Sequence, residues 1–146
     1  MNWKTEAMEK LKKYDAMRQA ALNLPEEINR LEQESVSIRG ARVDGTAVRG
    51  GGSKREEAIL NNMAERQELA WALEQTQSWL RVTERAIGAL PADEKLVLHR
   101  LYICPERGAI SRLCGELGLE QSSIYRKRDR ALRRFTMALY GRVEAE

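Results

Sequence analysis

Apolar residues in the first forty positions recur at the spacing of an α-helix. The start of this pattern, with apolar positions three to five residues apart, consists of Trp3, Met8, Leu11, Tyr14 and Met17. Pro25 interrupts it and is followed by two acidic residues, which is typical of the first turn of a helix. The pattern therefore predicts one helix over about 3–23 and a second over about 25–38, or a single helix kinked at Pro25.

Glycine interrupts this periodicity in the next segment. Residues 39–53 contain five glycines and no regular apolar spacing. Glycine loses more conformational freedom on ordering than any other residue, so a glycine-rich stretch resists regular structure. We expect residues 39–53 to form a flexible loop.

A second long apolar pattern begins after the glycine-rich segment. Ser53 and Glu56 have the spacing of a capping box and predict a helix from Ser53 to about Ala89. Its stripe, which repeats about every seven residues, consists of Ile59, Met63, Ala70, Leu73, Leu80 and Ile87, with polar exceptions at Arg66, Gln77 and Glu84. A helix of this length needs a partner. Pairing within the chain gives a helical hairpin, and pairing between chains gives a coiled-coil homo-oligomer; the pattern allows both.

The last third of the chain contains three shorter helical patterns. Pro91 and the acids after it start a helix that ends near Cys104, and further helices are predicted over 109–117 and 121–140. Gly118 stands where a C-terminal glycine is expected. The fold class is therefore all-α: a helical hairpin or coiled-coil region over 1–89, including the loop at 39–53, is followed by a helix-turn-helix domain over 90–146.

Charge is concentrated near the C-terminal end. The 146 residues carry a net charge of +3, which by itself indicates no partner. Residues 1–84 hold 13 basic and 14 acidic residues, residues 85–146 hold 12 and 8, and residues 121–134 hold six and one. The longest apolar runs are far shorter than the roughly 20 residues of a membrane span, and the first residues lack the apolar core of a signal peptide. We expect a cytoplasmic protein without a membrane partner.

The two helices joined by Gly118-Leu119-Glu120 have the spacing of a helix-turn-helix, whose second helix enters the major groove of DNA. Side chains suited to base contact at its start are Gln121, Ser122, Ser123, Tyr125 and Arg126. Cations suited to phosphate contact are Arg112, Lys127, Arg130, Arg133 and Arg134. Packing on the domain edge suits Tyr125 equally well. These residues predict double-stranded DNA as the partner.

Catalytic and metal chemistry have no support in the sequence. His99, Cys104 and Cys114 fit no zinc-ligand spacing. The sequence contains none of the common catalytic or phosphate-binding motifs. We therefore expect a protein that is not an enzyme and has no cofactor.

A family resemblance is carried by five runs: residues 90–98, residues 101–102, residues 110–118, residues 122–126 and residues 130–132. The segment from Leu90 to Leu139 resembles region 4 of sigma-70-type RNA polymerase factors, although Glu120 stands where that family often has a serine cap. The layout of the whole chain is similar to small phage transcriptional regulators of the ArpU and RinA type. The resemblance implies a sequence-specific DNA-binding regulator of phage or prophage genes in a bacterial host cell.

The sequence is also compatible with two other functions. Small terminase subunits, which act in phage DNA packaging, also combine a helix-turn-helix with oligomerising helices. A module that contacts RNA polymerase is the third possibility, since region 4 itself can do so.

Overall fold

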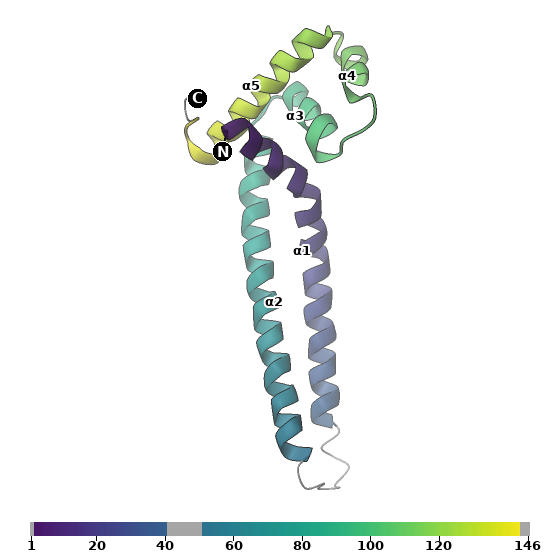
Figure 1. The fold of residues 1–146 in the computed structure, drawn as a ribbon, viewed down its shortest axis with the longest axis vertical. Coiled ribbons are helices and arrows are strands. Elements are labelled where there is room, and N and C mark those ends of the chain that lie inside the picture. Colours follow the sequence, from purple (N-terminus) through teal and green to yellow (C-terminus); the bar gives the residue numbers. More distant parts are fainter. Residues whose placement is uncertain (1, 41–50, 144–146) are drawn as a thin grey trace. The chain divides into compact units, whose positions relative to one another are not determined.

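The computed structural model describes residues 2–40 and 51–143, and every regular element in these two stretches is helical (Figure 1). The elements are α1 (Trp3–Gly40), α2 (Gly51–Gly88), α3 (Ala92–Leu98), the π-helix η2 (His99–Ile103), α4 (Ala109–Leu117) and α5 (Gln121–Tyr140). The predicted all-α class is confirmed. The bounds of α4 and α5 are those that their apolar patterns predict.

The first helix continues through Pro25, so a single α1 replaces the two helices that were one of the expectations. Pro25 has no N–H to donate to the carbonyl of Ala21, which normally weakens or ends a helix. Here Leu31 beyond the proline is buried to 2% exposure, so the helix keeps its packed face on the far side. Burial of that face offsets the missing hydrogen bond.

The long helices also include both ends of the expected loop. Arg39 and Gly40 belong to α1, and α2 begins at Gly51, two residues before the expected cap at Ser53. The guanidinium of Arg55 donates to the carbonyl of Ile38 over 3.1 Å, which satisfies one of the carbonyls that a helix C-terminus leaves free. The remaining residues of the expected loop, 41–50, lie outside the described residues.

The chain forms two compact units. Unit 1 comprises Met1–Arg18 and Ser78–Glu146, and unit 2 comprises Gln19–Gln77. This division lies elsewhere than the expected domain boundary between residues 89 and 90. The physical reason is the start of α1, where Ala7 and Leu11 are buried in the same cluster as Phe135 of α5.

Unit 2 is an antiparallel pair of helices. The side-chain amide of Asn62 in α2 donates to the carbonyl of Leu31 in α1 over 2.9 Å, and its oxygen accepts a hydrogen bond from Arg66 over 2.8 Å. Ser35 of α1 is also buried, at 5% exposure. The contact face of this hairpin is therefore partly polar, and its buried amide is paired, as the burial of a polar group requires.

The apolar stripe expected on α2 is wrong at every second position in this unit. Met63, Ala70 and the polar exception Gln77 are exposed, whereas Asn62, Leu69 and Thr76, each one residue earlier, are buried or partly buried. The buried positions still follow a seven-residue repeat. Polar residues occupy two of them, so a search for apolar residues alone selects the neighbouring positions.

Unit 1 has a core of two hydrophobic clusters. The larger contains Ala7, Leu11, Ala86, Leu90, Leu98, Tyr102, Ile103, Ala131, Leu132 and Phe135. The smaller contains Val97, Leu113 and Ile124 and so joins α3, α4 and α5. Between α3 and α4 the amide of Cys104 donates to the carbonyl of His99 over 2.9 Å, the five-residue step of a π-helix. The helix expected over 91–104 is therefore α3 followed by η2.

Candidate nucleic-acid interface

The connection between α4 and α5 is short and depends on a glycine. Gly118 ends α4 with a φ of +64°, a left-handed conformation that side chains other than glycine rarely adopt. Glu120 is the residue before α5, but its side chain makes no capping hydrogen bond. Buried Leu113 on α4 and Ile124 on α5 lie in one cluster, which holds the start of α5 against α4.

The buried and exposed faces of α5 are clearly separated. Ala131, Leu132 and Phe135 are fully buried. The exposed residues Ser122, Arg126, Arg130 and Arg133 follow each other at steps of four, four and three, which places them on one face of the helix. A row of three guanidinium groups with a hydroxyl at its N-terminal end thus faces solvent.

The five residues predicted to contact bases all lie in the first two turns of α5. Gln121, Ser122, Tyr125 and Arg126 are exposed and Ser123 is partly buried. Arg126 reaches the hydroxyl of Ser123 over 3.5 Å. A hollow on the surface brings together Ser123, Arg126, Lys127 and Arg130 with Leu119 and Asp129. The structure therefore gathers most of the predicted contacts at one end of one helix.

Tyr125 is placed by its neighbour Arg128. The guanidinium carbon of Arg128 lies 5.0 Å from the centre of the Tyr125 ring, within the range of a cation–π contact. Arg128 also donates to Asp129 over 3.0 Å and is only partly exposed. One face of the tyrosine ring is thus covered, while 36% of the residue remains accessible.

Two of the cations predicted to contact phosphate form ion pairs with α3. Lys127, whose side chain is 14% exposed, donates to Asp93 over 2.5 Å. Arg134 lies 3.1 Å from the carboxylate of the buried Glu94. The hydrogen bond from Lys127 lowers the pKa of Asp93 below its ordinary value. These ion pairs hold α5 on α3, which the sequence pattern of α5 alone does not reveal.

Arg112 on α4 is also paired within the chain. It donates to Glu106 over 2.5 Å, and Glu106 lies 3.6 Å from Arg100. Arg100 in turn lies 2.9 Å from Glu116. The Arg112 side chain nevertheless remains 60% exposed, so a phosphate has access to it. Its charge is already partly balanced by Glu106.

The cations that remain are Arg126, Arg130 and Arg133. None of the three has an ion pair with another residue in the described part of the chain, and all are exposed. A cation without an internal partner retains its full charge for an external anion. The structure thus divides the predicted phosphate contacts into cations that are paired with a carboxylate of the domain and cations that have no such pair among the described residues.

Sequence reasoning missed one cation at this surface. Lys4 in the first turn of α1 lies 3.8 Å from Asp129, the single acidic residue within 121–134. Its position beside α5 depends on packing between residues more than a hundred positions apart. The apolar spacing at the start of α1 indicates a buried face that includes Ala7 and Leu11. It does not identify the helix that packs against this face.

The two units differ in sign of charge. Unit 1 contains 18 basic and 12 acidic residues, and unit 2 contains 7 basic and 10 acidic residues. The excess positive charge of the chain is therefore confined to the unit that contains α5. An anionic polymer is attracted to the first unit and repelled by the second.

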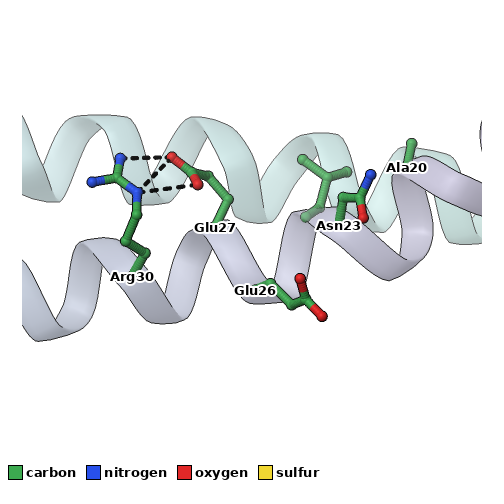
Figure 2. A pocket seen from close by; sticks show the side chains of 6 residues that line it. Ala20, Asn23, Glu26, Glu27 and Arg30 are labelled. Atoms are coloured by element: carbon green, nitrogen blue, oxygen red, sulfur yellow. Dashed lines mark hydrogen bonds and ion pairs between the residues drawn. The ribbon is translucent and has the colours of Figure 1, made fainter.

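A second hollow lies on α1, within unit 2. It is lined by Ala20, Asn23, Leu24, Glu26, Glu27 and Arg30 (Figure 2). Arg30 donates to Glu27 over 2.6 Å and lies 3.3 Å from Glu34, while Glu26 points away from Asn23 (Figure 2). Ligand sites combine apolar walls with converging polar groups. This hollow lacks the converging polar groups, because one helix supplies all of its lining and its cation, Arg30, is already paired.

Two further features concern metal and membrane chemistry. Within residues 2–40 and 51–143, no three His, Cys, Asp or Glu side chains gather as a set of metal ligands. None of the helices described is both long and apolar enough to cross a membrane.

Comparisons with known proteins give no relative. No protein-family model matches the sequence, and no curated protein or solved structure matches it either.

Proposed function

We propose that this chain is a sequence-specific DNA-binding transcriptional regulator of phage or prophage genes, in which α4 and α5 act as a helix-turn-helix. The observation that carries the proposal is the exposed face of α5, where Arg126, Arg130 and Arg133 form no ion pair with any residue of 2–40 or 51–143. The resemblance of residues 90–139 to region 4 of sigma-70-type factors supports the same arrangement. The function requires neither catalysis nor a cofactor.

The proposed roles follow the position of each side chain. The N-terminal residues of a recognition helix contact base edges, so Gln121, Ser122 and Arg126 are the proposed readers. Arg130 and Arg133 lie further along the same face and are proposed to bind phosphates, which fix the register of a protein on DNA. Lys127 and Arg134 hold α5 on α3.

The first experiment is a selection of binding sites from a random duplex library at one fixed salt concentration. We expect a defined motif with the intact chain, and loss of enrichment with Gln121→Ala and Arg126→Ala. Lys54→Gln is the matched control, because Lys54 is an exposed cation of the acidic unit. The absence of any enriched motif, or enrichment that survives both alanine variants, would overturn the proposal.

The competing functions predict different results. A packaging protein would form a ring-shaped oligomer and bind at a packaging site. A polymerase-binding module would retain RNA polymerase in Arg126→Ala and Arg130→Ala variants while showing no selected DNA motif.

A further inference from the structure

The start of α1 lies beside the proposed DNA-binding helix, within the same compact unit. Ala7 and Leu11 of α1 are buried with Ala131, Leu132 and Phe135 of α5. At the other end of this contact, the ammonium group of Lys10 lies 5.7 Å from the ring centre of Tyr140. The first turns of α1 are therefore anchored along one side of α5.

Lys4 is the cation that this packing brings to the exposed face of α5. Its ammonium group lies 3.8 Å from Asp129 and 5.7 Å from the centre of the Trp3 ring, which itself packs on the core. Asp129 is adjacent in sequence to Arg130 and also accepts a hydrogen bond from Arg128 over 3.0 Å. The acidic residue next to Arg130 in the sequence is thus paired with two cations.

We propose that the first turns of α1 form part of the DNA-contact surface and that Lys4 binds a backbone phosphate beside the groove that α5 enters. This inference rests on the proposed function. An approaching phosphate competes with Asp129 for Lys4, which is 33% exposed and therefore accessible from solvent. The pair at 3.8 Å is longer than a hydrogen bond, so the ammonium group keeps donors for a phosphate.

The test compares Lys4→Gln with Lys13→Gln in the intact chain, using a duplex with the selected motif and an unrelated duplex. Lys13 is exposed and lies nine residues further along α1, which is two and a half turns and therefore the opposite face. Removing one phosphate contact lowers the salt slope of log K by about 0.9 and the affinity near 0.15 M salt by about fivefold. For Lys4→Gln we expect the lower salt slope and the lower affinity with both duplexes. For Lys13→Gln we expect the salt slope and the affinity of the wild type.

A second variant separates a phosphate contact from a purely structural ion pair. Asp129→Asn releases Lys4 and removes a negative charge, so we expect tighter binding, opposite in sign to Lys4→Gln. Lys4→Arg keeps the charge and should bind as the wild type does. If Lys4 only holds α1 on α5, Lys4→Gln and Asp129→Asn will both lower the melting temperature and weaken binding; that result overturns the inference.

The outcomes distinguish this inference from the proposed function. If the wild-type chain binds neither duplex, the proposed function fails and the inference fails with it. If the wild-type chain binds and Arg126→Ala weakens binding, but Lys4→Gln matches Lys13→Gln in affinity and salt slope, only the role of Lys4 is contradicted.

Discussion

Lys127 of α5 donates a hydrogen bond to Asp93 of α3 over 2.5 Å, and its side chain is 14% exposed. Arg126 and Arg130 lie on another face of α5. Both are exposed, and neither forms an ion pair with a residue that the structure describes. Neighbouring cations of one helix thus differ in their contacts. Lys127 holds α5 on α3 through an ion pair, whereas Arg126 and Arg130 are accessible to an external anion.

The first prediction follows from this difference in contacts. Lys127→Gln should lower the free energy of unfolding by about 0.5–1 kcal/mol, since the pair is partly solvated, and leave the salt slope of DNA binding unchanged. Arg130→Gln should change the free energy of unfolding by less than about 0.5 kcal/mol and lower the salt slope by about 1. Urea denaturation and salt titrations of both variants check this. The reverse assignment of the two effects would contradict it.

The second prediction concerns acid. Because the hydrogen bond from Lys127 lowers the pKa of Asp93, the stabilisation is complete above the ordinary carboxylate range. It is lost as the pH falls through the lowered pKa. The difference in free energy of unfolding between the wild type and Asp93→Asn should therefore shrink as the pH falls from about 6 to about 3. Denaturant titrations across this pH range measure it. A difference that grows in acid would be inconsistent with the pair.

The third prediction concerns the partly polar contact face between the two helices of unit 2. Asn62 is 5% exposed, donates to the carbonyl of Leu31 and accepts from Arg66. Asn62→Ala removes both hydrogen bonds and leaves Arg66 without this acceptor, so we expect a loss of about 1–3 kcal/mol. Asn61→Ala is the matched control, because Asn61 is exposed on the same turn. Equal melting temperatures for the two variants would show that the hydrogen bonds of Asn62 do not stabilise this helix pair.

The fourth prediction tests whether the start of α1 belongs to the unit that contains α5. Leu11 is fully buried with Phe135, so Leu11→Ala should lower stability by about 2–5 kcal/mol and speed amide hydrogen exchange in α5. Leu22→Ala, at a position 64% exposed, should do neither. If amide hydrogen exchange in α5 is unchanged in Leu11→Ala, the start of α1 does not unfold together with α5, and the prediction is contradicted.

Local signals predicted the short helices well. Gly118 and Gly141 both adopt the left-handed conformation that ends a helix, so their positions marked the ends of α4 and α5. The interior of α5 also followed its apolar spacing, with Ile124 and Phe135 buried. Where a glycine and a clear apolar face agree, the sequence determines the element.

Long-range packing limited the rest of the prediction. The buried face predicted for α2 differs from the observed one by one residue at Met63, because the position that is in fact buried holds the polar Asn62. The pairing of Lys127 depends on how α3 meets α5, and the proximity of Lys4 to Asp129 depends on α1. Such contacts join distant parts of the chain, and residue types along one helix do not identify them.

The most direct measurement of the central claim is the ratio of affinities for a selected duplex and an unrelated duplex, at one salt concentration. We predict a ratio well above one for the wild type and for Lys54→Gln. Arg126→Ala should lower the affinity for the selected duplex by about 1–3 kcal/mol and reduce the ratio. A wild-type ratio of one, or a ratio that Arg126→Ala leaves unchanged, would contradict sequence reading by α5.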